Sequence, residues 1–212
     1  NAAFKFGEVR EIAIAGHKLR ALRVTYVGEL GWELHIPIAA IGEVFDALMA
    51  AGKAHGMVPT GYRALESLRL EKGYRAWGSD ITPNDTPFHA GLGWAVKLKS
   101  NQPFLGREAC EKVSTAPLAK MLAGFTTARE DVVLLGRETI LRDGKFAGYL
   151  TSGGFGNTVG KPIGYGYIRN GAGVSEEYIR AGSYELVVAN QREKANVHLE
   201  PLYDPANARV KS

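Results

Sequence analysis

The feature that most constrains this fold is a series of six short strand-like segments in the second half of the chain. They lie at 120–126, 138–141, 146–151, 163–168, 184–189 and 196–202, with frequent glycine among them. The sequence Asp143-Gly144 between the second and third segments is a strong hairpin signal, because both residue types accept the positive φ angles of a two-residue turn. Short strands with frequent glycine predict an antiparallel barrel or sandwich.

The first half of the chain is expected to add helices to strands. Apolar residues at the i, i+3, i+4, i+7 spacing predict an amphipathic helix over 39–51; they are Ile41, Val44, Phe45 and Leu48. Thr60 can cap a second helix over 61–72, and Gly52 and Gly73 are suitable stop signals for the two helices. We therefore expect an α+β protein.

A shorter helix near 107–113 leads into Ser114-Thr115-Ala116-Pro117, a sequence typical of a boundary between structural units. We predict two domains, at 1–113 and at 114–212. Cys110 is the single cysteine, which excludes an intrachain disulfide and suits a reducing compartment. We expect its thiol to be buried.

Between residues 22 and 36, the pattern predicts two strands joined by a glycine turn. The first strand would carry on one face Leu22, Val24 and Tyr26, and the turn would lie between Gly28 and Gly31. Side chains alternate across a strand, so the second would present on one face Trp32, Leu34 and Ile36, and on the other Glu33 and His35. Glu33 need not be buried, and its carboxylate can accept hydrogen bonds from a planar N–H donor. The alternative is a solvated surface hairpin.

Composition and spacing argue against several classes of function. The formal charge of +4 comes from 26 basic and 22 acidic residues without a dense basic run, so nucleic-acid binding has little support, whereas an anionic ligand such as a polyglutamyl tail is compatible. The histidines form no metal-ligand spacing, and no apolar run approaches the roughly 20 residues that span a bilayer. The chain is predicted to be soluble, without metal, nucleic-acid or membrane partners.

The glycine-rich run from Gly154 to Pro162 invites a phosphate-binding interpretation. Its glycines follow a G-x-G-x-x-x-G spacing, and Pro162 stands where a P-loop requires Ser or Thr. The residues after it look extended rather than helical. We therefore favour a barrel loop over a phosphate cradle.

Two motifs in order carry a resemblance to a known family. Residues 26–33, Tyr-Val-Gly-Glu-Leu-Gly-Trp-Glu, match Y-x-G-E-x-G-x-E, and residues 67–73, Ser-Leu-Arg-Leu-Glu-Lys-Gly, match S-L-R-L-E-x-G. The chain resembles the glycine-cleavage T-protein (aminomethyltransferase) superfamily, which includes the folate-binding regions of flavin-linked dimethylglycine and sarcosine dehydrogenases. Further runs at 61–66, 73–80, 85–94 and 151–155 extend the resemblance over almost the whole chain, and those at 61–66 and 73–80 are more similar to the dehydrogenase branch.

This resemblance implies a T-protein-like folate-binding domain, represented by its C-terminal portion at 1–113, followed by a small antiparallel β-barrel. Glu33 takes the position of the family's pterin-binding glutamate, because one carboxylate can accept both hydrogen bonds of the pterin's paired donor edge. Tyr26, Arg63 and Tyr203 are further candidate folate-binding residues. The family's helix arginine falls at Leu65 here, so Arg63 stands in a related position or is a surface residue paired with Glu66. Arg69 is expected to anchor the helix end through a carboxylate or a carbonyl.

The expected function is that of a C-terminal fragment of a tetrahydrofolate-dependent one-carbon enzyme, dimethylglycine or sarcosine dehydrogenase-like. Tetrahydrofolate would capture the released carbon as 5,10-methylenetetrahydrofolate, and FAD would belong only to a missing N-terminal domain. The alternatives are a T-protein-type aminomethyltransferase and a non-catalytic folate-binding module. The family's catalytic aspartate would lie upstream, so the isolated chain is expected to be inactive. Asn1-Ala2 resembles the remnant of an expression tag, and the expected location is the cytoplasm, or the mitochondrial matrix in a eukaryote.

Overall fold

The computed structural model describes residues 3–211 and divides the chain into two compact units. The first unit is Asn1–Arg69 together with Asp204–Ser212, and the second is Leu70–Tyr203. Asn1-Ala2, the expected tag remnant, lies outside the described residues. Among the residues described, no helix is long and apolar enough to cross a membrane.

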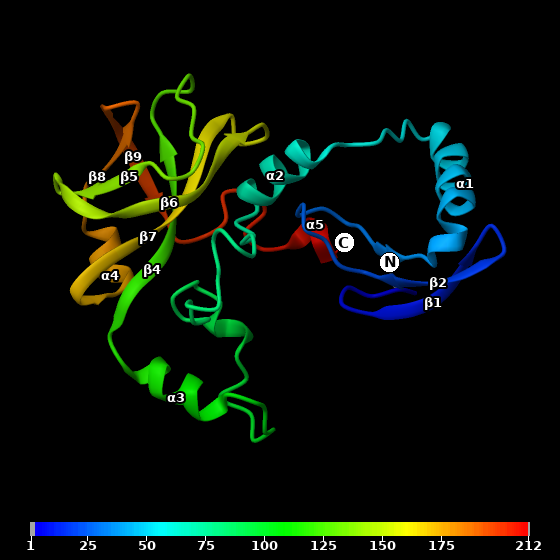
Figure 1. Cartoon of the computed structure of the whole chain (residues 1–212), viewed down its shortest axis with the longest axis horizontal. Helices are drawn as coiled ribbons and strands as arrows, with labels where there is room; N and C mark the ends of the chain where they lie inside the picture. Colours follow the sequence, from blue (N-terminus) through cyan, green and yellow to red (C-terminus); the bar gives the residue numbers. More distant parts are fainter. Residues whose placement is uncertain (1–2, 212) are drawn as a thin grey trace. The chain divides into compact units, whose positions relative to one another are not determined.

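The first unit is a small antiparallel sheet covered by a helix (Figure 1). Its strands are β1 (Val9–Ile14), β2 (His17–Leu22) and β3 (Glu33–His35), in the order β1-β2-β3. The 3-10 helix η1 (Ile38–Ala40) leads into α1 (Ile41–Lys53). Leu19 of β2 is buried with Ala40 and Val44, and Leu48 packs against them. Only this half of the predicted apolar stripe covers the sheet, because Ile41 and Phe45 are 55% and 54% exposed. The predicted helix is confirmed, beginning two residues later because η1 precedes it.

The predicted hairpin at 22–36 differs from the structure at its first strand. β2 ends at Leu22, which pairs with Glu33 of β3, and a loop follows to Trp32. The chain leaves the sheet because backbone donors turn to local acceptors: the Val24 N–H bonds the Leu22 carbonyl at 3.0 Å, and the Val27 N–H bonds the Thr25 hydroxyl at 3.1 Å. Val24 and Tyr26 therefore lie in this loop and not on a strand.

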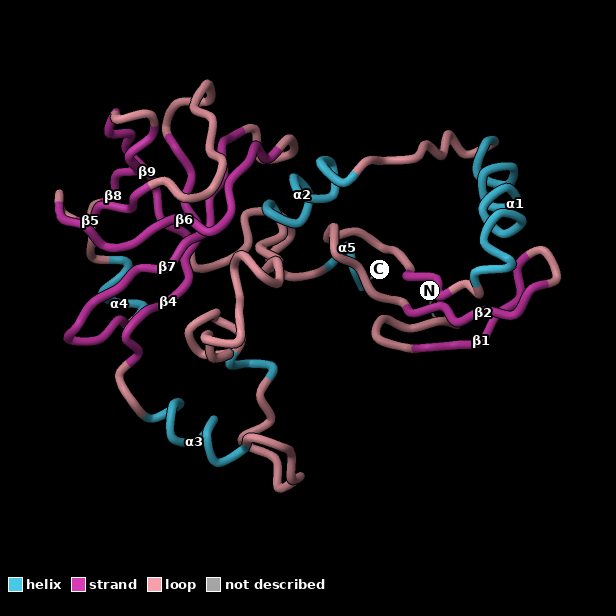
Figure 2. Tube along the Cα trace, viewed as in Figure 1, coloured by secondary structure: helices cyan, strands magenta, loops and turns pink. Residues whose placement is uncertain are grey.

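The second unit contains a closed antiparallel barrel (Figure 2). Its strands follow the order β4-β7-β6-β5-β8-β9, and β9 closes the barrel onto β4. The bounds are Leu118–Thr127 for β4, Thr139–Arg142 for β5, Lys145–Gly156 for β6, Lys161–Val174 for β7, Tyr184–Val188 for β8 and Gln191–His198 for β9. The α+β class and the predicted barrel are confirmed.

Turn geometry explains where the predicted strands fit and where one was misplaced. Asp143 and Gly144 have φ angles of 52° and 75°, as expected for the tight turn that joins β5 to β6. Ala189 and Asn190, with φ angles of 46° and 64°, form an equivalent turn between β8 and β9. Alanine is not a usual residue for positive φ, so the sequence did not indicate this turn, and β9 begins five residues earlier than predicted.

Close strand contact accounts for one of the glycines inside the barrel. Gly148 of β6 has a φ angle of 156°, and a Cβ atom there would lie 1.9 Å from the Tyr167 carbonyl oxygen of β7. Only glycine allows the two backbones to approach in this way. The core behind these strands is apolar and fully buried, and includes Phe125, Ile140, Leu150, Ile168, Ile179 and Leu186.

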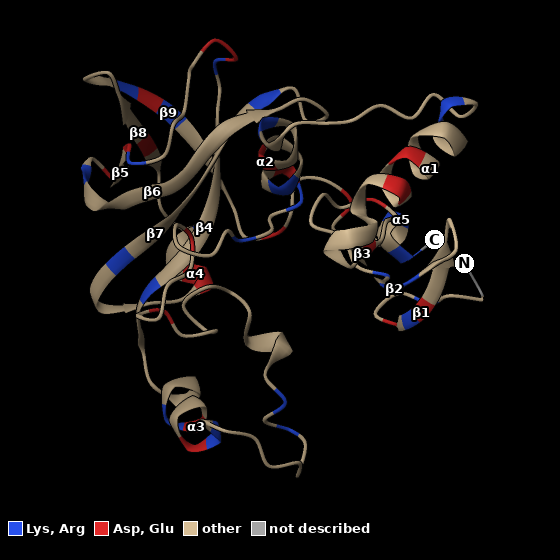
Figure 3. Ribbon diagram, turned by 45° about the vertical axis from the view of Figure 1, so that its right-hand side comes forward, with Lys and Arg blue, Asp and Glu red and all other residues tan. Residues whose placement is uncertain are grey.

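The remaining helices lie outside the barrel wall and outside the first sheet. They are α2 (Tyr62–Glu71), η2 (Gly93–Ala95), α3 (Arg107–Thr115), α4 (Glu176–Arg180) and α5 (Ala208–Lys211). α2 confirms the second predicted helix, and α3 extends two residues into the expected linker. Cys110, expected to be buried, is only half-buried on α3. Basic and acidic residues are interspersed along both units (Figure 3).

Candidate ligand site

Glu33 begins β3 directly after the loop that carries the first family motif. Its side chain is exposed, as the alternation of the strand predicted. Within residues 3–211, the Glu33 carboxylate has no hydrogen bond or ion pair with another residue. The carboxylate is therefore available to an external donor. Gly28, in the loop before Glu33, has a φ angle of 80°, which glycine adopts at no steric cost.

An aromatic and cationic cluster fixes the two ends of this loop. Arg23 is buried although charged, and its guanidinium donates to the Phe4 carbonyl oxygen and lies 6.0 Å from the ring centroid of Trp32. The Phe4 and Trp32 rings meet edge to face at 6.2 Å. Trp32 thus packs against the N-terminal segment and is 44% exposed, whereas Leu34 packs on the α1 core. The predicted grouping of Trp32 with Leu34 on one strand face is wrong, because Trp32 precedes the strand.

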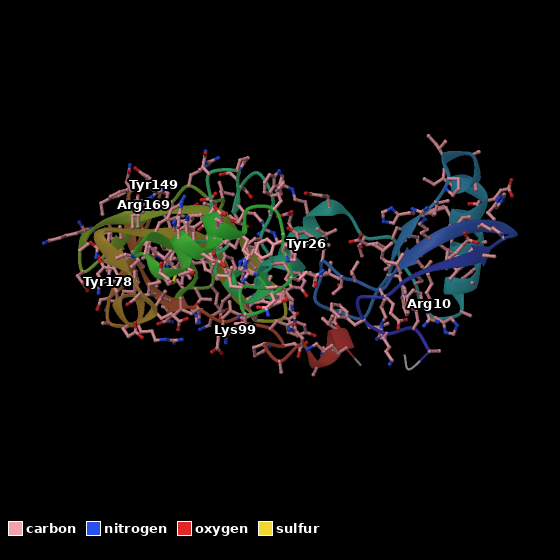
Figure 4. All side chains as sticks on the ribbon, turned by 90° about the horizontal axis from the view of Figure 1, so that it is seen from below. Arg10, Tyr26, Lys99, Tyr149, Arg169 and Tyr178 are labelled. Atoms are coloured by element: carbon pink, nitrogen blue, oxygen red, sulfur yellow. The ribbon has the colours of Figure 1, made fainter. Side chains whose placement is uncertain are left out.

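Tyr26 lies in the middle of the same loop and is half-buried; Figure 4 labels its side chain. Glu29, three residues later, forms an ion pair of 3.7 Å with Arg209 of α5. Tyr26 and Glu33 lie on one short segment of the first unit, residues 26–33. Their shared role in folate binding stays a prediction.

The two arginines of α2 have different surroundings. Arg69 is 3% exposed, and its Nε and Nη2 atoms donate to Glu66 Oε2 at 2.9 and 2.7 Å. This agrees with the expected anchoring role of Arg69 and shows that Glu66 pairs with Arg69. Arg63 is exposed and, within the described part of the chain, makes no ion pair. The folate-binding role of Arg63 stays a prediction.

Tyr203 belongs to the second unit, unlike the other three candidates. Its side chain is half-buried, and its backbone N–H donates to the carbonyl oxygen of Glu71 at 3.0 Å. That carbonyl belongs to the last turn of α2, where backbone acceptors lack partners inside the helix. This hydrogen bond holds the backbone of Tyr203 at the C-terminal end of α2.

The glycine-rich loop binds an internal carboxylate, which sequence analysis missed. Glu71 is 1% exposed, and its Oε1 atom accepts hydrogen bonds from the N–H groups of Thr158 and Val159 at 2.6 and 2.8 Å. A Cβ atom on Gly156 would lie 3.0 Å from the Glu71 Oε1 and Cγ atoms. Two N–H donors that a phosphate could have used thus bind Glu71. The sequence signal that could have pointed to this contact was Glu71 itself, the glutamate of the S-L-R-L-E-x-G motif.

Asp80 is a second buried carboxylate that no motif singled out. One of its oxygens accepts from the hydroxyls of Thr151 and Ser152 at 2.5 and 2.7 Å, and the other accepts from the Ala76 N–H at 2.9 Å. The Tyr167 hydroxyl donates to the Asp80 carbonyl at 2.9 Å, and burial raises the pKa of Tyr167 well above its usual value. These bonds fasten the segment after α2 to β6 and β7.

A cluster of charged and aromatic side chains surrounds Lys120, near the start of β4. Lys120 pairs with Asp85, and its Nζ lies 4.7 Å from the ring centroid of Tyr167. Burial opposes ionisation of Asp85, but hydrogen bonds from Lys120 and Thr82 outweigh it and lower the pKa. Burial and the positive charge of Lys120 both lower the pKa of His89. Among the described residues, no group of three or more His, Cys, Asp or Glu side chains could hold a metal ion.

Two family profiles match successive parts of the chain. Residues 1–100 match the GCVT N-terminal domain, and residues 120–204 match the glycine cleavage T-protein C-terminal barrel domain. The chain belongs to the glycine-cleavage T-protein (aminomethyltransferase) superfamily.

Individual relatives include two dehydrogenases and an aminomethyltransferase. It is 46% identical over 213 residues to mitochondrial sarcosine dehydrogenase of Mus musculus, covering 100% of this chain and 23% of that protein. It is 34% identical over 211 residues to mitochondrial dimethylglycine dehydrogenase of the same species, covering 98% of this chain and 24% of that protein. The solved glycine cleavage system aminomethyltransferase T from Bartonella henselae superposes with a TM-score of 0.80 at 25% identity, covering 97% of this chain and 54% of that one. The chain thus spans about a quarter of the length of these dehydrogenases.

Proposed function

We propose that this chain forms the folate-binding C-terminal part of a larger tetrahydrofolate-dependent enzyme that is sarcosine or dimethylglycine dehydrogenase-like. The observation that carries the proposal is 46% identity over the whole chain to a sarcosine dehydrogenase. In the intact protein, tetrahydrofolate would take up the carbon released from an N-methyl amine as 5,10-methylenetetrahydrofolate. FAD would belong to a part of the protein outside these 212 residues.

The environment of Glu33 supports this assignment of the ligand. A pterin presents an exocyclic amine and a ring N–H side by side, and a carboxylate can accept both hydrogen bonds. Glu33 supplies an exposed carboxylate without an internal partner among residues 3–211. It lies on a strand whose backbone is paired with β2, so binding would not require the sheet to open. Tyr26, Arg63 and Tyr203 are proposed as further folate contacts.

The test is titration of the full-length protein with tetrahydrofolate, comparing Glu33→Gln with the parent. The variant should bind about 10- to 150-fold more weakly, which corresponds to about 1.5–3 kcal/mol for a hydrogen bond to a charged group. Asp46→Asn is the matched control, because Asp46 is an exposed carboxylate of the same unit on α1 and has no partner among the described residues. A folate affinity of Glu33→Gln within twofold of the parent, with unaltered melting, would support the solvated-hairpin interpretation instead.

A T-protein-type aminomethyltransferase is the second candidate, favoured by the TM-score of 0.80 with a solved aminomethyltransferase. Steady-state assays of the full-length protein separate the two. Oxidation of sarcosine or dimethylglycine supports the first, and transfer from an aminomethyl-lipoyl donor supports the second. Folate binding without either activity would indicate the non-catalytic module.

Organisation and location follow as parts of the same proposal. We place the domain boundary at residue 114, and we expect the isolated chain to be inactive without the upstream catalytic aspartate of the family. The mitochondrial names of the two dehydrogenases favour the matrix in a eukaryote, and the cytoplasm is the bacterial equivalent. Limited proteolysis and a methylene-transfer assay of the isolated chain test these points.

A further inference from the structure

A pocket opens in the barrel wall where β6 and β7 separate, and we call it the β6–β7 pocket. Pairing between these strands begins at Gly148 and Ile168, and residues 145–147 and 169–171 lie beyond its end. The register of β6 against β5 shifts between Phe146 and Gly148, as at a β-bulge, which bends a strand away from its neighbour. The pocket has a volume of about 550 Å³, within the usual range of small-molecule sites.

The lining of this pocket is positively charged. Its charged members are three cations and one carboxylate, namely Arg142, Lys145, Arg169 and Asp143. Arg142 and Asp143 form an ion pair of 2.5 Å with each other. Lys145 and Arg169 are exposed, and neither forms an ion pair within the described part of the chain. The lining therefore carries a net charge of +2, which resides on Lys145 and Arg169.

Arg142 is held rigidly at one side of the pocket. Its guanidinium stacks on the ring of Tyr178 of α4, with Cζ 3.9 Å from the ring centroid, and its Nη2 donates to the Tyr178 carbonyl oxygen at 2.9 Å. Its Nε is buried and has no hydrogen-bond acceptor among the described residues. A buried charged group with an unsatisfied donor is costly, so an anion bound nearby would compensate a charge that the fold leaves incompletely paired.

Aromatic rings form another part of the pocket wall. Phe146 of β6 lines the pocket together with Tyr178, and Phe146 is 57% exposed. The Phe146 ring meets the Tyr149 ring edge to face at 5.0 Å, which favours one orientation of an exposed ring. Figure 4 labels Tyr149, Arg169 and Tyr178 on the barrel. An oriented ring beside two unpaired cations suits a ligand that is both anionic and planar, because aromatic faces stack on flat rings.

We propose that the β6–β7 pocket binds a phosphate monoester that carries a planar ring, such as a nucleoside monophosphate. A phosphate monoester carries a charge of about −1.5 to −2 at pH 7, which matches the +2 of the lining, whereas one carboxylate would leave half of that charge uncompensated. Lys145 and Arg169 contact the phosphate, and Phe146 stacks on the ring. All lining residues fall within 120–204, the residues that match the T-protein barrel domain, so a single matched domain supplies the whole pocket.

The test is calorimetric titration of the full-length protein with adenosine 5′-monophosphate, adenosine and inorganic phosphate in separate runs without tetrahydrofolate. The monophosphate should bind at least about 10-fold more tightly than either part alone, the scale of one stacked ring or one hydrogen bond to a charged group. Arg169→Gln and Lys145→Gln should each weaken its binding about 10-fold, and Phe146→Ser should remove its advantage over inorganic phosphate. Lys194→Gln is the matched control, because Lys194 is an exposed cation of β9 without an ion pair in the described part of the chain.

Three results would overturn the proposal. The first is monophosphate binding that is absent at millimolar concentration or no tighter than that of adenosine or phosphate. The second is an unchanged affinity in both Arg169→Gln and Lys145→Gln, whose exposed side chains can be replaced with little change in melting temperature. The third is displacement of the monophosphate by tetrahydrofolate together with its loss in Glu33→Gln, which would assign it to the proposed folate site. Because the titrations contain no folate, their outcome is independent of the proposed function.

Discussion

Replacement of Glu71 by alanine should destabilise the barrel unit strongly, because it removes the acceptor at the centre of the glycine-rich loop. The Glu71 carboxylate accepts two short backbone hydrogen bonds, from Thr158 and Val159. Hydrogen bonds to charged groups contribute about 1.5–3 kcal/mol each. Thr158 is exposed, so water can replace part of what is lost, and we expect a loss near the lower end, about 3 kcal/mol in total.

Thermal and urea unfolding of the 212-residue chain measure this effect. A loss of about 3 kcal/mol corresponds to a fall of about 6–12 °C in melting temperature for a protein of this size. Glu71→Gln keeps an oxygen acceptor and should cost only about 1 kcal/mol, the loss of charge assistance. Glu130→Ala, an exposed residue of the same unit, is the control. A loss below 1 kcal/mol for Glu71→Ala, or equal losses for both Glu71 variants, would refute the reasoning.

Two further predictions concern the arginines of α2 and two half-buried histidines, His89 and His198. Arg69→Ala should lower the free energy of unfolding by about 2–3 kcal/mol, less than the roughly 3–5 kcal/mol lost on breaking a fully buried pair, because Glu66 is partly accessible. Arg63→Ala should change the free energy of unfolding by less than about 0.5 kcal/mol but should weaken folate binding to the full-length protein. An unchanged folate affinity would remove Arg63 from the site. Burial lowers the pKa of His89 and His198 from the ordinary 6.5, so both contribute stability that is complete above pH 6.5 and is lost as pH falls through their lower folded pKa values. Melting temperatures at pH 8, 7, 6 and 5 should decline below pH 6.5, and His198→Gln should flatten that decline; equal slopes for parent and variant would contradict the assignment.

The sequence predicted the elements of this fold better than their connections. Strand spacing and the Asp143-Gly144 turn indicated the barrel, because both depend on local conformational preference. The turn at Ala189-Asn190 was missed, since alanine at positive φ reflects the geometry of the β8–β9 hairpin and not its own propensity. The strand predicted through Tyr26 ended at Leu22 for a similar reason, because the hydroxyl of Thr25 competes with the sheet for a backbone donor.

The candidate site was predictable where it depends on one strand and not where it depends on contacts distant in sequence. Alternation placed Glu33 on an exposed face, and the structure agrees. No local pattern could show that Asp80 would meet Thr151 and Ser152, about seventy residues away. The folate roles of Glu33, Tyr26, Arg63 and Tyr203 derive from the family resemblance and stay predictions.

The two motif glutamates show why a matched motif does not by itself identify a ligand contact. Glu33 and Glu71 are the same residue type, and each belongs to one of the two motifs that carry the resemblance. Glu71 is buried against two backbone N–H groups that lie 87 and 88 residues away in sequence, and those donors leave its bound oxygen little capacity for a ligand. Glu33 is exposed and, among the described residues, meets no such donors. A carboxylate satisfied by the fold stabilises the fold, whereas a carboxylate left with its acceptors facing solvent can bind a planar donor from outside. Glu33 is therefore the residue on which a test of folate binding should begin.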